Sequence, residues 1–272
     1  MSGGTSQEER GRRFARLHAD GCFLIPNPWD AGTARVLESL GFEALATTSS
    51  GFAFTLGRAD GAVTLDEVVE HVATLVAATD LPLSVDLENG YGAAPEHAAR
   101  AVEAVAAVGA VGGSIEDWDA AAGIYEIGAA AERIAAAAEV ARELPFPFLL
   151  TARAENHIRG NPDLEDTIAR LRAYEAAGAD VLYAPGLGTV AEIETVVAAV
   201  GRPVNALARP TFSVAEIADA GARRISVGGA LAWATVEAMA GVAERMRETG
   251  DLSGLRGGGQ VAEWLAAGTE DV

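Results

Sequence analysis

Short apolar runs alternate with longer amphipathic stretches along most of this chain. Runs rich in Val, Ile, Leu, Phe and Ala predict eight strands, at residues 22–26, 44–48, 83–87, 113–117, 148–152, 181–184, 204–206 and 224–227. Stretches in which apolar residues recur at helical spacing predict helices at 31–40, 65–78, 95–108, 129–144, 163–177, 190–200, 214–220 and 231–247. Strands and helices therefore alternate almost from end to end.

Three of the predicted helices end in the same sequence pattern, a glycine followed by a short link into the next strand. Gly41, Gly178 and Gly221 occupy this position, where glycine favours the end of a helix. Strand–helix alternation with such short returns implies parallel strands, and a (β/α)8 barrel typically has about 250 residues. We therefore expect an α/β protein that is a single (β/α)8 TIM barrel domain over residues 1–272, with an N-terminal helix.

A doubly wound parallel sheet is the alternative fold. In its dinucleotide-binding form, that fold has a glycine-rich turn directly after the first strand. Here the position holds Pro26, Asn27, Pro28, Trp29 and Asp30, so the barrel is favoured.

The C-terminal residues 253–272 differ from the rest of the chain. A glycine-rich connector at 254–259 leads to a short predicted helix at 260–267, with Val261, Trp264 and Leu265 on one face. This helix could dock on its own barrel or be exchanged with a neighbouring subunit, and the spacing alone favours neither.

Charge and cysteine content narrow the class of partner. The formal net charge is −19, which argues against nucleic acid and against an anionic membrane. A small anionic substrate is still allowed, because a metal ion and an arginine can reverse the field locally. The single cysteine, Cys22, excludes an intrachain disulfide. No apolar run is close to the length needed to span a membrane, and residues 1–13 lack the apolar core of a signal peptide. We therefore expect a cytoplasmic protein.

Two carboxylates end the third predicted strand. Asp86 and Glu88 alternate at period two and therefore point to the same side. Such acids repel each other unless a cation lies between them, and carboxylate oxygens are ligands that Mg²⁺ prefers. The next strand ends in the same way, at Glu116 and Asp117. This pattern predicts a divalent-metal enzyme, although the acids could also be solvated loop residues.

The other strand ends supply groups that suit a small acid. Arg153 could clamp a substrate carboxylate, or form a structural ion pair with Glu155. The turn at 48–51 offers hydroxyl and backbone N–H groups to an oxyanion, and Asn205 ends the seventh strand. This set of side chains and backbone groups suits a 2-oxo or 2-hydroxy acid whose enolate is stabilised by a metal ion. The histidines His18, His71 and His97 fall on predicted helices and are expected at the surface.

Six segments, in this order and spacing, resemble the isocitrate lyase / phosphoenolpyruvate mutase superfamily. They are Pro26 to Gly32, Ala46 to Gly51, Leu56 to Asp60, Asp86 to Gly92, Ser114 to Asp117 and Thr151 to Asn156. The resemblance implies a (β/α)8 barrel, dependence on Mg²⁺ (with Mn²⁺ as an alternative), and substrates built on 2-oxo acids or small di- and tricarboxylates. It also implies a homo-oligomer, a dimer or a tetramer that exchanges a terminal helix.

The same resemblance implies roles for individual residues. Asp86 resembles the direct metal ligand, whereas Glu88 and Glu116 resemble residues that hold metal-bound water. Asp60 resembles the acid of a catalytic loop. The remaining assignments are Arg153 and Asn205 for the substrate carboxylate, and Trp29, Thr48, Ser49, Ser50 and Gly51 for the oxyanion side.

The lid after the fourth strand departs from the superfamily pattern. Its lyases carry a cysteine general acid there, whereas residues 118–127 contain neither cysteine nor lysine. A proton would then come from Tyr125, Glu126 or water. We expect a Mg²⁺-dependent carbon–carbon lyase that decarboxylates an oxaloacetate-like acid or cleaves a substituted malate or isocitrate. The alternatives are a phosphonate enzyme of the mutase or phosphonopyruvate hydrolase type, and a non-catalytic 2-oxo-acid binder.

Overall fold

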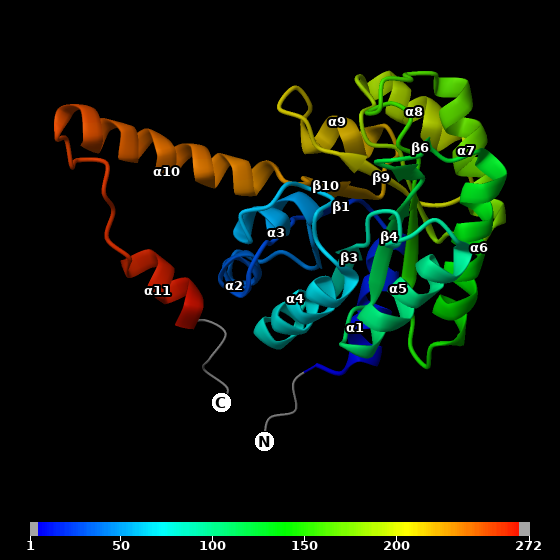
Figure 1. Cartoon of the computed structure of the whole chain (residues 1–272), viewed down its shortest axis with the longest axis horizontal. Coiled ribbons are helices and arrows are strands. Elements are labelled where there is room, and N and C mark those ends of the chain that lie inside the picture. Colours follow the sequence, from blue (N-terminus) through cyan, green and yellow to red (C-terminus); the bar gives the residue numbers. More distant parts are fainter. Residues whose placement is uncertain (1–4, 267–272) are drawn as a thin grey trace.

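Eight parallel strands form the centre of the computed structural model, which describes residues 5–266 (Figure 1). They are β1 (Phe23–Ile25), β2 (Leu45–Ala46), β3 (Leu83–Asp86), β4 (Gly112–Glu116), β7 (Leu149–Arg153), β8 (Val181–Tyr183), β9 (Val204–Leu207) and β10 (Arg224–Ser226). Their order is β1-β10-β9-β8-β7-β4-β3-β2. The backbone N–H of Ala46 donates to the carbonyl oxygen of Pro26 at 3.1 Å, which links β2 to the end of β1 and closes the barrel.

The predicted strands and the predicted fold class are confirmed. Each of the eight predicted runs overlaps one barrel strand, with ends that differ by at most two residues. The doubly wound alternative is wrong, because β1 pairs in parallel with β10, the last strand of the barrel. A barrel of parallel strands brings all carboxyl ends to one mouth.

Most of the helices surround the barrel or connect its strands. They are α1 (Gln7–Ala19), α2 (Ala31–Ser39), α3 (Ser49–Thr55), α4 (Leu65–Ala78), α5 (Pro95–Ala107), α6 (Ile127–Glu143), α7 (Leu164–Ala176), α8 (Val190–Ala199), α9 (Val214–Asp219), α10 (Ala230–Thr249) and α11 (Gly259–Ala266). Capping boxes fix the starts of several of them, with Thr64, Thr189 and Ser213 as the N-cap residues.

Two short elements at the mouth were not predicted. The turn after β2 continues into α3, because the Thr48 side chain accepts a hydrogen bond from the Gly51 N–H and so caps the helix. The segment after β4 folds as a two-stranded hairpin, β5 (Trp118–Asp119) and β6 (Gly123–Ile124). Both are too short to give a periodic signal in the sequence.

The expected N-terminal helix, α1, covers the end of the barrel opposite the mouth. Phe14 is fully buried and its ring meets the rings of His18 and Phe23 edge to face. The expectation that His18 lies at the surface is wrong, since this face of α1 packs into the barrel and leaves the side chain 5% exposed.

The C-terminal helices are placed differently from each other. Figure 1 shows α10 projecting away from the barrel and α11 returning beneath it towards α2. Ser39 Oγ donates to the Trp264 carbonyl oxygen at 2.8 Å, so the predicted helix at 260–267 docks on its own chain as far as residue 266. Ala267 and the rest of the predicted C-terminal segment lie outside the described residues. Over residues 5–266, no helix is long and apolar enough to cross a membrane.

Candidate active site

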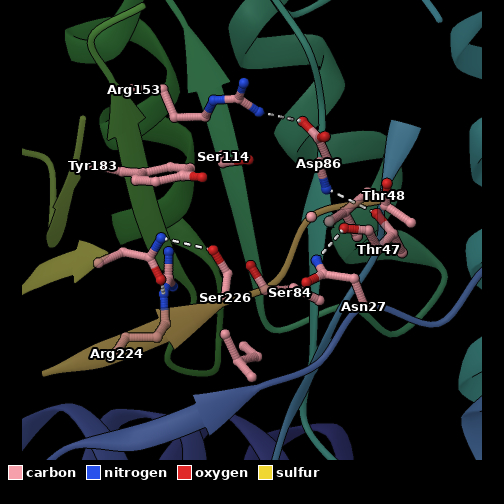
Figure 2. Close-up of a pocket in the computed structure, with 15 residues that line it drawn as sticks. Asn27, Thr47, Thr48, Ser84, Asp86, Ser114, Arg153, Tyr183, Arg224 and Ser226 are labelled. Atoms are coloured by element: carbon pink, nitrogen blue, oxygen red, sulfur yellow. Dashed lines mark hydrogen bonds and ion pairs between the residues drawn. The ribbon is translucent and has the colours of Figure 1, made fainter. Parts of the chain in front are cut away.

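Polar side chains gather at the carboxyl ends of the strands and in the barrel interior beneath them. They line a cavity of about 60 Å³ (Figure 2). Four residues singled out from the sequence share this cavity: Thr48, Asp86, Arg153 and Asn205. Thr48, Asp86 and Arg153 come from the ends of three different strands, which agrees with the usual position of an active site in such a barrel, whereas Asn205 lies within β9.

Arg153 lies at the centre of an acid cluster. Its guanidinium is 3.3 Å from Asp86 Oδ1, 3.0 Å from Glu116 Oε2 and 2.7 Å from Glu155 Oε1. Burial alone would lower the pKa of Arg153, but Glu155, Glu116 and Asp86 raise it well above its usual value. The ion pair with Glu155 that the sequence left open is therefore present, and Asp86 and Glu116 join it.

A second guanidinium, which the sequence reading missed, approaches the same acids from outside. Arg159 Nη2 lies 3.1 Å from Glu155 Oε2 and 3.8 Å from Glu116 Oε1. The Arg159 guanidinium also covers the ring of Trp118 at 3.5 Å from its centre. The signal in the sequence was the spacing of four residues from Glu155 to Arg159, which suits an ion pair across one helical turn.

Glu88 is half-buried beside Asp86 and the loop that carries Asp60. Burial raises the pKa of Glu88 to about 7, and the charges of Asp86 and Asp60 add to the effect. A side-chain carbon built on Gly61 would lie 3.8 Å from Glu88 Oε2, so the loop that carries Asp60 lies beside Glu88. Burial also raises the pKa of Glu116. Neighbouring acids add to the effect of burial at both residues, so both carboxyl groups hold a proton more tightly than usual.

The loop after Asp86 has a strained backbone that a buried arginine supports. Glu88 and Tyr91 have φ of 47° and 62°, a left-handed conformation that non-glycine residues seldom adopt. Arg133, only 1% exposed, donates to the carbonyl oxygens of Gly92 and Ala93 at 2.6 Å and also to that of Asn89. Arg133 therefore fixes the course of this loop.

The predicted oxyanion side is the start of helix α3. The Ser49 N–H donates to Asp86 Oδ2 at 3.3 Å, and the Asp86 N–H donates to Thr47 Oγ1 at 2.8 Å. Thr48 Oγ1 lies 3.1 Å from Ser50 Oγ. The first N–H groups of a helix attract negative charge, so the strand end at Thr47 and the helix start together orient Asp86.

Two predicted substrate-binding residues make structural contacts. A side-chain carbon built on Gly51 would meet Trp29 Cβ at 3.2 Å, so Trp29 packs against the start of α3. Asn205 Nδ2 donates to Ser226 Oγ at 2.9 Å, while Asn205 Oδ1 accepts from Arg224 Nε at 2.8 Å. Asn205 therefore lies on the cavity wall, within the barrel interior.

The two predicted proton donors have different surroundings. The Tyr125 hydroxyl lies 3.5 Å from Asn89 Nδ2, and the Tyr125 ring lies 4.6 Å from the Arg133 guanidinium. This contact joins the lid to the loop of the acid cluster. Glu126 is exposed at the start of α6, and its side chain makes no capping hydrogen bond. Only Tyr125 is thus brought to the loop by a direct contact.

The donor set fits a hydrated dication better than a bare one. No three acidic, histidine or cysteine side chains among residues 5–266 are close enough to hold an ion by themselves. Asp86, Glu116 and Glu155 share two guanidiniums, and burial together with the charges of neighbouring acids raises the pKa of Glu88 and Glu116. Mg²⁺ usually keeps several waters and takes only one or two carboxylates directly, so these residues fit it.

The barrel with its acid and arginine cluster defines a TIM-barrel enzyme, and comparisons with known proteins identify its family. The family model described as phosphoenolpyruvate phosphomutase matches residues 14–247. A solved structure from Burkholderia cenocepacia, classed provisionally as a lyase/mutase, has a TM-score of 0.92 and 50% identity and covers 96% of each chain. The chain therefore belongs to the phosphoenolpyruvate phosphomutase family, in the superfamily that its sequence resembled.

Two curated relatives carry names of lyases. Oxaloacetate decarboxylase of Rhodopseudomonas palustris is 30% identical over 81% of this chain and 78% of its own length. 2-Methylisocitrate lyase of Halalkalibacterium halodurans is 30% identical over 74% of this chain and 68% of its own length. Lyases and mutases are thus both represented among the relatives, and the expectation of an enzyme from this superfamily is confirmed.

Proposed function

We propose that the protein is a Mg²⁺-dependent carbon–carbon lyase that acts on a 2-oxo acid or a small di- or tricarboxylate. The observation that carries the proposal is the placement of Arg153 among Asp86, Glu116 and Glu155, at 3.3, 3.0 and 2.7 Å. This arrangement offers acids to a cation and a guanidinium to a substrate carboxylate at one strand-end cluster. The names of the two curated relatives support the same reaction class.

The residues of the cluster exchange partners in this scheme. Mg²⁺, held directly by Asp86 and through water by Glu88 and Glu116, would supply Lewis acidity for the charge released when the carbon–carbon bond breaks. Arg153 would present one edge of its planar guanidinium to the substrate carboxylate, a geometry for which that group is suited. The loop of Asp60, which lies beside Glu88, would limit the access of water when substrate is bound.

The proton that replaces the broken bond would come from the lid side. Tyr125 is the better placed of the two candidates, because it contacts Asn89 in the loop that carries Glu88. Its pKa is raised by burial, so the hydroxyl keeps its proton at neutral pH. Tyr125→Phe should then reduce kcat while leaving KM nearly unchanged, whereas Glu126→Gln should have little effect.

The decisive experiment is a turnover panel with Mg²⁺ and oxaloacetate, 2-methylisocitrate or 2,3-dimethylmalate. We expect turnover of at least one compound, and a loss of about 10³-fold or more in Asp86→Asn. The matched control is Asp66→Asn, which changes an exposed acid on α4. Full activity in Asp86→Asn would refute the metal assignment, and oxalate binding without any turnover would instead favour a non-catalytic 2-oxo-acid binder.

A phosphonate enzyme is the second candidate, since the family model itself is described as phosphoenolpyruvate phosphomutase. Phosphorus NMR with phosphonopyruvate separates the two proposals, because carbon–phosphorus rearrangement or hydrolysis moves the phosphorus resonance. We expect no such change over a time in which the carbon–carbon substrate is consumed.

We also propose that the protein is a homo-oligomer, either a dimer or a tetramer. Helix α10 leaves its own barrel (Figure 1) and exposes large apolar side chains, with Trp233 at 38% and Met239 at 61%. An exposed apolar face of this kind is typical of an interface. Light scattering should give a mass above that of one chain, and Met239→Glu should lower it if α10 forms the contact.

A further inference from the structure

The interior of this barrel is polar, whereas the interior of a TIM barrel is normally filled by Val, Ile and Leu. Asp86 and Arg153 line the upper part of the cavity, and its deeper part is lined by the hydroxyl and amide groups of Ser84, Ser114, Asn205 and Ser226, together with the guanidinium of Arg224 (Figure 2). These deeper residues come from four different strands, β3, β4, β9 and β10. So many polar side chains facing one another indicate a cavity that is built to hold a polar or charged guest.

Arg224 is a buried cation without an anionic partner. It is 5% exposed, and it forms no ion pair with any carboxylate of residues 5–266. Its contacts are all neutral: Nε donates to Asn205 Oδ1 at 2.8 Å, Nη2 donates to Thr151 Oγ1 at 3.0 Å, and Nη1 lies 3.4 Å from His18 Nε2. A guanidinium does not lose its proton in proteins, so the charge persists.

The contact between Arg224 and His18 confirms that the environment of Arg224 is neutral. His18 Nδ1 lies 2.8 Å from the Phe14 carbonyl oxygen. A carbonyl oxygen can only accept, so Nδ1 carries the proton and Nε2 accepts from Arg224. His18 therefore contributes no negative charge. Three contacts also leave part of the five-donor guanidinium fork unused.

We propose that the barrel cavity binds a small monovalent anion of the chloride class beside Arg224. A buried charge is costly unless it is paired, and the acids that could pair with Arg224 are held at the mouth by Arg153. The cavity volume of about 60 Å³ suits a halide, or about two water molecules at liquid density. The side chains of Ser84 and Ser114 line it and provide further donors.

The anion site and the proposed substrate site belong to the deep part and the mouth of one cavity, and the two levels differ in charge. At the mouth, Arg153 is surrounded by carboxylates, which repel an anion that arrives without a cation. In the interior, the cation is surrounded by groups that donate or are neutral. A small inorganic anion would thus prefer Arg224 to Arg153, and its binding would not require the proposed reaction.

Thermal unfolding at constant ionic strength tests the proposal in the full chain without substrate. Gluconate is too large for the cavity and serves as the reference anion. Replacing it by chloride should raise the unfolding midpoint by about 5 °C, and the rise should level off once the site is saturated with chloride. Arg224→Met should abolish the chloride effect. Arg202→Met, which removes an exposed arginine, should keep it. An equal midpoint in both salts for the wild-type protein would overturn the proposal.

A second measurement does not depend on the folding of a variant. A wild-type crystal soaked in bromide should show an anomalous peak within hydrogen-bond reach of the Arg224 guanidinium. A cavity with water alone, or a peak at Arg153 instead, would overturn the proposal. Because neither measurement involves turnover, failure here would leave the proposed lyase activity unaffected, and the reverse also holds.

Discussion

Two buried arginines, one at the mouth of the barrel and one in its interior, carry the same charge in opposite surroundings. Arg153 has three carboxylates within 3.3 Å. Arg224 has an amide oxygen, a hydroxyl group and a neutral imidazole. At the mouth the acids outnumber the cations, and in the interior the cation is alone. The charges around each guanidinium, and not the residue type, therefore decide what it can bind.

This contrast gives the barrel a gradient of charge along its axis. The acid cluster is suited to a cation, and through that cation to an anionic substrate. The interior is suited to an anion without any cofactor. Polar links such as the Asn205–Ser226 hydrogen bond lie between the two levels, so the charges are separated by neutral dipoles and do not cancel.

The largest expected effect follows from removing each arginine in turn. Arg153→Met removes the ion-pair partner of Asp86 and leaves Glu116 and Glu155 with Arg159 alone, which should cost about 3–5 kcal/mol of the free energy of unfolding in metal-free buffer. Arg224→Met removes an unpaired charge and should change the same free energy by about 1 kcal/mol or less in halide-free buffer. Urea unfolding at pH 7.5 measures both.

Added Mg²⁺ provides the control for this comparison. If the acids bind the ion, Mg²⁺ should restore part of the stability that Arg153→Met loses, and it should not affect the change caused by Arg224→Met. Equal losses in the two variants would mean that the surroundings of the two arginines do not differ in energy as they do in geometry.

The sequence predicted the mouth better than the interior. Asp86, Glu88 and Arg153 stand at strand ends in a recognisable order, and the barrel follows from periodicity and from glycines at helix ends. Arg224 follows another arginine at the start of a strand, where a solvated residue is the ordinary expectation. Nothing in its spacing shows that the barrel closes around it, because inward direction depends on strand tilt and register across the whole barrel.

The helical pattern also hid two functional features. Arg133 stands on the apolar face of α6 beside Ala130, Ile134 and Ala137, and a single arginine there does not disturb the period. A signal was nevertheless present, because a charged residue on an otherwise apolar face needs a buried partner. The start of α3 was interpreted as a turn, since seven residues are too few for a periodic signal.

The next largest effect concerns the histidine beside Arg224. Burial, and then the charge of Arg224, lower the pKa of His18 to about 3. The unfolded chain binds a proton near pH 6.5, whereas the folded chain does not, so stability is lost as pH falls below about 6.5. We expect a loss of about 2 kcal/mol between pH 7 and pH 5. Urea titrations of His18→Gln should show a smaller loss, and His97→Gln, at an exposed site, should behave like the wild-type protein.

The smallest expected effect has the opposite sign and belongs to the mouth. The pKa of Glu88 is raised to about 7 by burial and by Asp86 and Asp60, so the folded chain holds a proton that the unfolded chain releases near pH 4.5. In EDTA, stability should therefore fall as pH rises from about 5 to 8. The fall should be about 1 kcal/mol, because solvent that reaches Glu88 weakens the effect. Urea titrations of Glu88→Gln should lack this pH-dependent loss of stability.

With Mg²⁺ present, the decline should shrink, since the ion replaces the proton as the partner of Glu88. A decline that is unchanged by Mg²⁺ would place the ion elsewhere, and a decline that persists in Glu88→Gln would assign it to another buried acid such as Glu116.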